Sequence, residues 1–275
     1  MMLKRLTVIT CLFLAAAFTV AELTTANDAS QPTPDQKPPT PQQSFSMDAR
    51  DVPVLMYHHL DEHPNTSGAI TPEQFEAQLQ WLDQMGYRSI NPDQLVDSIE
   101  SGDTFSRPKV LMTFDDGYRS TLTHALPLLE TYGFEATLFI YTERIQDTPG
   151  HLSADELLVM QSRGITIASH AVSHADLPAL LTKEGLPAVQ HELNHSREIL
   201  ESLMKTEVTH LAFPYGAYCP DVINAARDAG FNGLFAITRN RDCQDDTIVQ
   251  RIPVLRETTL DEFRTLLSPS GKTGS

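Results

Sequence analysis

Two adjacent aspartates, Asp115 and Asp116, end a short apolar run and are followed by Gly117. The run from Lys109 to Phe114 is typical of a buried strand. Two ionised carboxylates inside such a strand would cost several kcal/mol or shift their pKa values. We therefore expect the pair at the mouth of the strand, where a cation or a substrate can use it. A plain Asp-Asp-Gly turn between two strands accounts for these residues equally well.

His170 and His174 form a second candidate pair, directly after another predicted strand. On one helical turn, or in a compact loop, this spacing places both imidazoles on the same side. Two histidines and one carboxylate are a standard ligand set for a divalent metal with an open position for water. A lone pair at this spacing is more often two surface histidines, but together with the two aspartates it indicates a metal site more specifically.

The elements that must position these residues alternate between strand and helix. Predicted strands cover residues 52–57, 87–90, 109–114, 136–141, 165–168, 210–213, 233–238 and 249–254. Helices are expected between them, including 71–86, 91–102, 153–164, 182–205 and 220–229. This order is typical of a parallel sheet covered by helices. Seven or eight such units over roughly 220 residues favour a (β/α) barrel over an open sheet.

In a parallel barrel the chemistry lies where the strands end. Polar residues follow four of the predicted strands: His58 and His59, Asp115 and Asp116, His170 with His174, and Tyr215. Because these strand ends share one rim, we expect the four groups to meet there. The other histidines, among them His151, are expected at the surface.

The composition limits the class of protein. At 275 residues, with 41% hydrophobic and 20% charged residues, the chain can bury a substantial core and form one large or two small domains. Its formal net charge of -16 argues against nucleic acid as a main partner.

The amino terminus predicts export. Lys4 and Arg5 precede an apolar run from Leu6 to Val20, with small residues near Ala21. This pattern is typical of a secretory signal peptide and is short for a membrane span, although an uncleaved anchor is the alternative. We assign 1–26 to the signal peptide, 27–50 to a Pro/Gln/Thr-rich linker, 51–268 to the folded domain and 269–275 to a tail. The expected location is secreted or periplasmic.

Export leaves Cys219 and Cys243 as the two mature cysteines. Two cysteines in an oxidising compartment can pair. We expect a disulfide between them, with two unpaired thiols as the alternative.

Three motifs resemble those of polysaccharide deacetylases with a NodB homology domain (carbohydrate esterase family 4). They are Thr113–Gly117, His170–His174 and Phe213–Gly216. The opening Val54–His59 is similar to the branch that includes poly-β-1,6-N-acetylglucosamine deacetylases. The resemblance runs from about 52 to 255, and it implies a distorted (β/α) barrel of about seven parallel strands.

The resemblance also implies roles for individual residues. Asp115 matches the general base, and Asp116, His170 and His174 match the ligands of one divalent metal, often zinc, with cobalt or nickel as alternatives. Tyr215 matches the residue whose backbone N–H helps to hold the oxyanion. Such a site would hydrolyse acetyl groups, because a metal activates water and polarises a carbonyl while a separate carboxylate takes the proton.

The sequence departs from the family pattern at two points. Ala171 stands where Ser or Thr is usual, which removes hydrogen-bonding support around the metal ligands. No histidine follows His210, so the usual late general acid is missing. His58 or His59 is our candidate for that acid; alternatively, one is a core and one a surface residue. Arg251 resembles the late arginine that orients the catalytic carboxylate, although an ordinary surface arginine is nearly as good an explanation.

The leading hypothesis is therefore a metal-dependent deacetylase of an exported N-acetylglucosamine polysaccharide, with the poly-β-1,6-linked polymer as the first candidate. We expect a monomer whose partner is an acetylated amino-sugar polysaccharide, with export machinery as a further candidate partner. The alternatives are a catalytically weak polysaccharide-binding module and a deacetylase of peptidoglycan, chitin oligomers or acetylated xylan.

Overall fold

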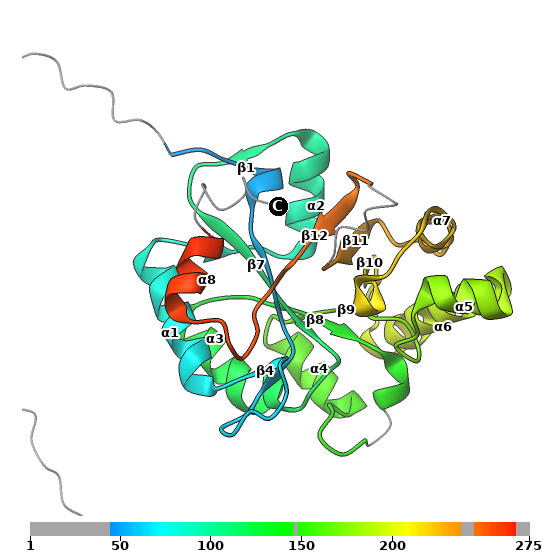
Figure 1. The fold of residues 1–275 in the computed structure, drawn as a ribbon, viewed down its shortest axis with the longest axis horizontal. Helices are drawn as coiled ribbons and strands as arrows, with labels where there is room; N and C mark the ends of the chain where they lie inside the picture. The colour runs from blue at the N-terminus through cyan, green and yellow to red at the C-terminus, as the bar shows by residue number, and fades with distance from the viewer. Residues whose placement is uncertain (1–44, 146–147, 238–244, 268–275) are drawn as a thin grey trace, which may run out of the picture. The chain divides into compact units, whose positions relative to one another are not determined.

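The computed structural model describes residues 45–145, 148–237 and 245–267. Its central sheet is parallel, and six of its strands lie side by side in chain order (Figure 1). These strands are β2 (Val54–Tyr57), β7 (Lys109–Asp115), β8 (Thr137–Ile140), β9 (Thr166–Ser169), β10 (His210–Ala212) and β11 (Gly233–Ala236). A short strand, β5 (Arg88–Ser89), pairs with the start of β7.

The C-terminal strands join the two edges of this sheet. β12 (Ile248–Gln250) pairs with β11, and β13 (Ile252–Pro253) pairs with β2 at the opposite edge. Arg251 alone separates β12 from β13. A single stretch of chain therefore nearly closes the sheet into a barrel, which confirms the predicted α/β fold, a distorted (β/α) barrel of about seven parallel strands.

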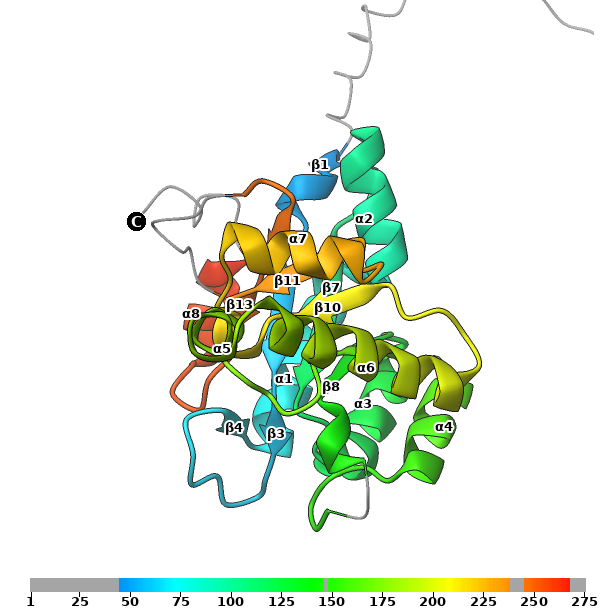
Figure 2. The same cartoon turned by 90° about the vertical axis from the view of Figure 1, so that its right-hand side faces the viewer.

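Helices pack around the outside of the barrel (Figures 1 and 2). They are α1 (Pro72–Gln84), α2 (Pro92–Ser101), α3 (Leu126–Tyr132), α4 (Ala154–Ser162), α5 (Leu177–Glu184), α6 (Leu186–Met204), α7 (Pro220–Asp228) and α8 (Leu260–Leu266). Capping boxes start α1, α2, α4 and α8, in which an N-cap side chain and the third helical residue satisfy each other's backbone N–H groups. Because these signals are local, the sequence placed the starts of α1, α2 and α4 correctly.

Alternation along the strands divides the core into two layers. Leu111, Phe139 and Phe235 point into the barrel, where the rings of the two phenylalanines lie 5.3 Å apart. The neighbouring residues Met112, Leu138 and Leu234 are buried on the other face, under the helices. Successive strand residues point to opposite faces, so strands apolar on both faces make a packed barrel rather than a pore.

Short elements complete the described structure. The strand pairs are β1 (Met47–Asp48) with β6 (Thr104–Phe105) and β3 (His59–Leu60) with β4 (Ala69–Ile70). Single turns of 3₁₀-helix are η1 (Ala49–Asp51), η3 (Thr142–Arg144) and η4 (Pro214–Gly216), and η2 (Thr121–Ala125) is a π-helical turn before α3.

Two predicted boundaries need correction. Residues 47–50, which we assigned to the linker, belong to the folded domain because β1 pairs with β6 and η1 follows it directly. The helix predicted over 182–205 is two helices, since Gly185 takes a φ of 83° between α5 and α6. A positive φ costs glycine little and breaks the helical hydrogen-bond pattern.

Several predictions fall outside the described residues. These are the signal peptide, most of the linker, the tail and Cys243, so the disulfide between Cys219 and Cys243 stays a prediction. Within the described ranges, no helix is both long and apolar enough to cross a membrane.

Candidate active site

The Asp115–Gly117 segment is a tight turn at the end of β7. Asp116 and Gly117 both have left-handed backbone angles, with φ values of 69° and 72°. A Cβ on Gly117 would lie 2.7 Å from Cδ1 of Ile140, so both the conformation and the space require glycine there. At the rim of the barrel, Oδ2 of Asp115 and Oδ1 of Asp116 each lie 3.8 Å from Nε2 of His170.

Asp116 meets His170 and His174 at this rim. The ligand atoms of the three side chains all lie within 4.8 Å of one another. Oδ1 of Asp116 is 3.8 Å from Nε2 of His170 and 3.5 Å from Nε2 of His174. That oxygen is buried and has no hydrogen-bond partner among the described residues. A divalent cation would satisfy it, and one carboxylate with two imidazoles is a donor set suited to such a metal.

His170 is held in the tautomer that a metal ligand needs. Its Nδ1–H donates to the carbonyl oxygen of Ala212 at 2.7 Å, which leaves the lone pair of Nε2 facing the aspartate pair, 3.8 Å from Oδ2 of Asp115 and from Oδ1 of Asp116. Burial lowers the pKa of His170 to about 4, against the opposing charge of Asp115. The imidazole is therefore neutral, and able to act as a ligand, at neutral pH.

Asp115 lies in a different environment from its neighbour. Burial raises its pKa, but the charge of Arg251 and hydrogen bonds from its guanidinium outweigh that effect and hold the pKa at about 2. Nη1 and Nη2 of Arg251 donate to Oδ1 and Oδ2 of Asp115 at 2.6 and 2.8 Å. For Asp116, burial and then repulsion from Asp115 raise the pKa to about 6.

Arg251 reaches Asp115 because of the way the barrel closes. It lies between β12 and β13, and its backbone N–H donates to the carbonyl oxygen of Ala236 at 2.8 Å. Its guanidinium lies over the ring of Phe139, 5.2 Å from the centroid. Both partners are almost fully buried, at 4% exposure for Arg251 and 2% for Asp115. An ordinary surface arginine, the alternative explanation, is wrong.

Tyr215 arrives at the same place from η4, just after β10. Its backbone takes a left-handed φ of 58°, which is uncommon for a residue with a side chain and often marks a functional turn. The residue is 62% exposed, and its ring lies 4.5 Å from the ring of His174, nearly edge-on. The turn therefore presents Tyr215 to the Asp116, His170 and His174 cluster.

The two histidines after β2 have different surroundings. Nδ1 of His59 lies 2.9 Å from Oγ of Ser120, and its Nε2 lies 3.4 Å from Asp61. His58 instead lies near the aspartates. Burial and larger neighbouring charges have the strongest effects on the pKa values of Asp115 and Asp116, and the charge of His58 is a weaker effect that lowers both values. Nδ1 of His58 is buried without a hydrogen-bond partner among the described residues. The alternative explanation, that one is a core and one a surface residue, is wrong, since both are partly exposed.

Aromatic rings that sequence reasoning missed border the site. The rings of Tyr118 and His151 stack at 5.0 Å, and the ring of Tyr141 lies 6.1 Å from His151 and 5.3 Å from His174. His151, expected at the surface, is half-buried because its backbone forms a bridge to Tyr118. Tyr141 directly follows β8, so applying the strand-end rule to aromatic residues would have found it.

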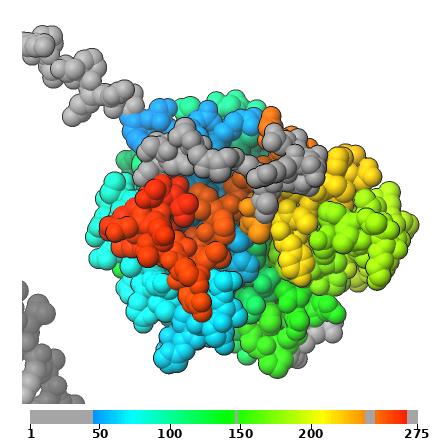
Figure 3. Space-filling model, viewed as in Figure 1, coloured from blue at the N-terminus to red at the C-terminus, as the bar shows by residue number. Residues whose placement is uncertain are grey.

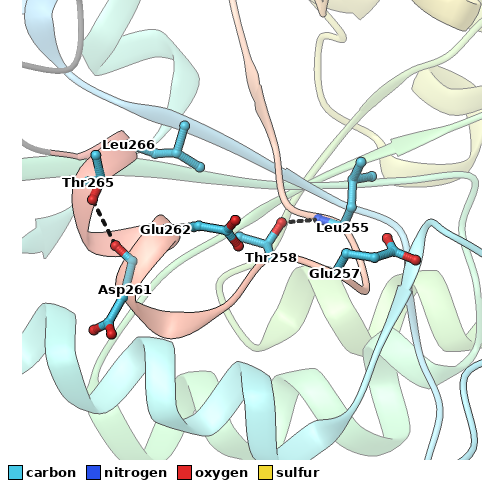
Figure 4. Close-up of a pocket in the computed structure, with 7 residues that line it drawn as sticks. All are labelled: Leu255, Glu257, Thr258, Asp261, Glu262, Thr265 and Leu266. Carbon is cyan, nitrogen blue, oxygen red and sulfur yellow. Dashed lines mark hydrogen bonds between the residues drawn. The ribbon is translucent and has the colours of Figure 1, made fainter.

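A separate pocket lies on the C-terminal segment around α8 (Figure 4). Its lining residues are Leu255, Glu257, Thr258, Asp261, Glu262, Thr265 and Leu266. None of them belongs to the rim cluster. In the space-filling view this red and orange segment lies between the cyan N-terminal part of the domain and the yellow residues near 210 (Figure 3).

The fold and the site together define a class: a (β/α) barrel with one candidate metal centre at its carboxyl rim and an ionised aspartate beside it. Comparison with known proteins agrees with this class. The family model of polysaccharide deacetylases matches residues 102–234. The protein YxkH of Bacillus subtilis (strain 168) is 29% identical over 180 residues, which are 66% of this chain and 62% of YxkH.

Another relative has a more specific name. The poly-beta-1,6-N-acetyl-D-glucosamine N-deacetylase of Staphylococcus epidermidis is 26% identical over 209 residues, covering 72% of this chain and 71% of that protein. Among solved structures, the Streptococcus pyogenes deacetylase PplD superposes with a TM-score of 0.71 at 21% identity, covering 82% of this chain and all of PplD. IcaB from Ammonifex degensii has a TM-score of 0.67 at 21% identity, covering 80% of this chain and 97% of that chain.

Residues 102–234 therefore match a polysaccharide deacetylase domain of the NodB-like type, carbohydrate esterase family 4. The solved structures confirm its barrel fold. The motifs that carried the resemblance in the sequence lie together at the rim of that barrel.

Proposed function

We propose that this protein is a metal-dependent hydrolase that removes N-acetyl groups from an exported N-acetylglucosamine polysaccharide. The observation that carries the proposal is the pairing of two different aspartates at the barrel rim. Asp115 is kept ionised by Arg251, and Asp116 faces His170 and His174 with an unsatisfied oxygen. A metal ligand and a free carboxylate are the two groups that hydrolysis of an amide by activated water requires.

In this proposal Asp116, His170 and His174 hold one divalent ion, which supplies Lewis acidity and an activated water when bound. Asp115 would accept a proton from the attacking water, because its low pKa keeps it unprotonated and Arg251 holds its carboxylate in place. The backbone N–H of Tyr215 stabilises the developing oxyanion. His58 gives a proton to the leaving amine, in place of the late histidine that this chain lacks.

Zinc is the proposed metal, with cobalt and nickel as alternatives. Two imidazoles and one carboxylate are a frequent catalytic zinc set with an open position, and cobalt and nickel accept similar nitrogen and oxygen donors. Atomic emission spectrometry of the protein as purified, without added metal, identifies the ion that it selects.

The proposed substrate is poly-β-1,6-N-acetylglucosamine. The name of the Staphylococcus epidermidis relative and the similarity of Val54–His59 to that branch support this choice. The aromatic rim of Tyr118, Tyr141 and His151 offers the mixed apolar and polar lining that is common in ligand sites. Peptidoglycan, chitin oligomers and acetylated xylan are the competing substrates.

The proposal includes a location and partners. A signal peptide in 1–26 would export the protein, as a monomer, to the periplasm or the medium, where it would meet the polymer and its export machinery. The sequence of that segment supports this, with Lys4 and Arg5 before the apolar run. Export predicts an oxidised Cys219–Cys243 pair, which thiol titration of the unreduced protein checks.

One observation favours a second candidate function, a polysaccharide-binding module with little turnover. No histidine follows His210 in the sequence, so the usual late acid is missing.

Acetate release separates the two functions. With zinc bound, the protein should release acetate from β-1,6-linked oligomers faster than from β-1,4-linked oligomers or peptidoglycan, and chelation should stop the release. A metal-loaded protein that binds polymer and releases no acetate from any of the three would contradict the enzyme proposal.

A further inference from the structure

The loop that carries the two histidine ligands has an unusual backbone. Ala171 and His174 both take left-handed angles, with φ values of 66° and 59°. Such angles are unfavourable for residues with side chains, so they persist only where the surroundings impose them. Ala171 offers no side-chain hydrogen bond of its own. The constraint must therefore come from outside the loop.

Glu192 of α6 supplies part of that constraint. Its Oε2 accepts hydrogen bonds from the backbone N–H groups of Val172 and Ser173, both at 2.9 Å. Its Oε1 accepts the hydroxyl of Ser173 at 2.7 Å. Glu192 is buried, with only 7% of the residue exposed. A charged carboxylate in such a position is expensive unless its oxygens are satisfied, and here the loop satisfies both.

Ser196, one helical turn further along α6, holds the start of the same loop. The backbone N–H of Ala171 donates to Oγ of Ser169 at 3.1 Å, and Oγ of Ser169 lies 2.8 Å from Oγ of Ser196. The hydroxyl of Ser196 donates to the carbonyl oxygen of Leu193, so the hydroxyl of Ser169 is the donor to Ser196. Residues four apart lie on one face of a helix, which places Glu192 and Ser196 side by side against the loop.

The carbonyl groups of the loop are held from the opposite side. The backbone N–H groups of Thr142 and Glu143, in η3, donate to the carbonyl oxygens of Ala171 and Val172 at 3.1 and 2.9 Å. The loop is therefore fixed by two elements. Glu192 of α6 accepts hydrogen bonds from its N–H groups, and η3 donates hydrogen bonds to its carbonyl oxygens. Among the groups that hold the loop, the Glu192 carboxylate is the charged one. Charge-assisted hydrogen bonds are about twice as strong as neutral ones, so its hydrogen bonds are the strongest of the set.

We propose that Glu192 is a positioning residue for the metal centre: its carboxylate, supported by Ser196, fixes the 171–173 backbone so that His170 and His174 converge on Asp116. The inference rests on the metal site of the proposed function and extends it to α6. Glu192 does not touch the metal or the substrate. Its effect is to pre-organise the ligands, so that binding a cation needs no ordering of the loop.

The test measures metal affinity directly in the full-length protein. Zinc and cobalt are titrated calorimetrically into wild type and Glu192→Gln. Gln keeps the volume but presents an N–H₂ where one oxygen accepts a hydrogen bond. We expect metal affinity to fall about 10- to 100-fold, as is usual when the groups that orient metal ligands are removed. Glu198→Gln, on the exposed face of α6 with 73% of its side chain accessible, is the matched control and should bind metal like wild type.

Amide hydrogen exchange gives a readout that needs no metal. In the metal-free protein the N–H groups of Val172 and Ser173 should exchange faster in Glu192→Gln than in wild type, with the β8 amides unchanged. Should Glu192→Gln fail to fold, Ser173→Ala removes only the 2.7 Å hydrogen bond to Oε1 and should weaken metal binding about 2- to 10-fold.

The outcomes separate this inference from the proposed function. Wild-type metal affinity in Glu192→Gln, or in Ser173→Ala where Glu192→Gln does not fold, would overturn the positioning role and leave the proposed function intact. A wild-type protein that binds neither zinc nor cobalt would overturn both. Weak binding in the Glu192 and Ser173 variants with normal binding in Glu198→Gln supports the inference.

Discussion

Asp115 and Asp116 are adjacent in the chain, yet their carboxyl groups have opposite electrostatic surroundings. Arg251 holds the pKa of Asp115 at about 2, while burial and the charge of Asp115 raise that of Asp116 to about 6. Neighbouring titratable groups whose pKa values are driven apart commonly divide acid–base and binding roles between them. Here the division follows from the partners of the two groups: Arg251 binds both oxygens of Asp115, while Oδ1 of Asp116 faces His170 and His174.

The two aspartates should respond differently to the same substitution. Asp115→Asn should still bind zinc but lose about 10²- to 10⁴-fold in kcat, the usual contribution of a positioned base. Asp116→Asn should lose metal binding, because an amide is a poor ligand beside two imidazoles. Calorimetric zinc titration and acetate release measure the two effects. Equal loss of metal in both variants would contradict the division of roles.

His58 and His59 allow a matched comparison for the missing acid. His58→Ala should lower kcat substantially, because the charge of His58 acts on both aspartates and its Nδ1 has no hydrogen-bond partner among the described residues. His59→Ala should change kcat much less, because His59 is engaged with Ser120 and Asp61. Steady-state kinetics on an N-acetylglucosamine oligomer at saturating zinc compares the variants. If neither changes kcat, another group supplies the proton.

At the scale of elements, the site depends on what each strand brings to the rim. β7 and its turn supply the aspartates, the loop after β9 supplies the histidines, and η4 after β10 supplies Tyr215. The closing segment between β12 and β13 supplies Arg251. The strand-end rule predicts the first three groups. It does not predict the pairing of Arg251 with Asp115, which requires the two edges of the sheet to meet.

Arg251→Met therefore tests the closing segment. Removing one partner of a buried ion pair costs about 3–5 kcal/mol, because the remaining charge is left buried without compensation. Chemical denaturation of the metal-free protein should show a loss of that order.

The same variant should shift the pH dependence of activity. Without Arg251, burial dominates and the pKa of Asp115 rises, so the acidic limb of kcat against pH should move to higher pH. Arg251→Lys keeps a charge, so its stability and the pH of its acidic limb should both lie between those of Arg251→Met and wild type. An unchanged acidic limb in both variants would show that Asp115 is not the group being titrated.

Some features of the site could not be predicted from the sequence. Capping boxes, apolar runs and strand-end motifs are local, so they gave the helix starts, the barrel and the residues at its rim. Glu192 looks like any charged helical residue until α6 is packed against the loop after β9. The break at Gly185 and the role of Tyr118 likewise depend on three-dimensional contacts between distant segments. Tertiary contacts, rather than local preference, decide these features.

At the scale of the whole molecule, the metal-free protein should carry a pH-dependent cost at Asp116. Its folded pKa, about 6, lies above the unfolded value of 3.8. The protonated form is therefore favoured by folding, and the stability that this form contributes is present below pH 3.8 and lost as the pH rises through 6. A metal would replace the proton as the compensating charge.

The comparison of Asp116→Asn with wild type isolates this cost. In the metal-free state the variant should be more stable than wild type at pH 7, by on the order of 1–3 kcal/mol for a shift of this size. The difference should shrink towards zero below about pH 4, where the wild-type carboxyl is protonated in both states. Urea denaturation at several pH values, with chelator present, measures it. A variant less stable than wild type at pH 7 would contradict the assigned electrostatics.

The closing segment also sets the order in which this molecule can become active during its synthesis. A ribosome delivers β2 and β7 early, so the aspartate pair exists long before residues 248–253 emerge. Until then the sheet has two open edges, and Asp115 has no guanidinium beside it. Growing chains, and any product that stops before Arg251, should therefore lack an ionised, oriented base. By our proposal, hydrolysis starts only once residues 248–253 have been made and the two edges have met.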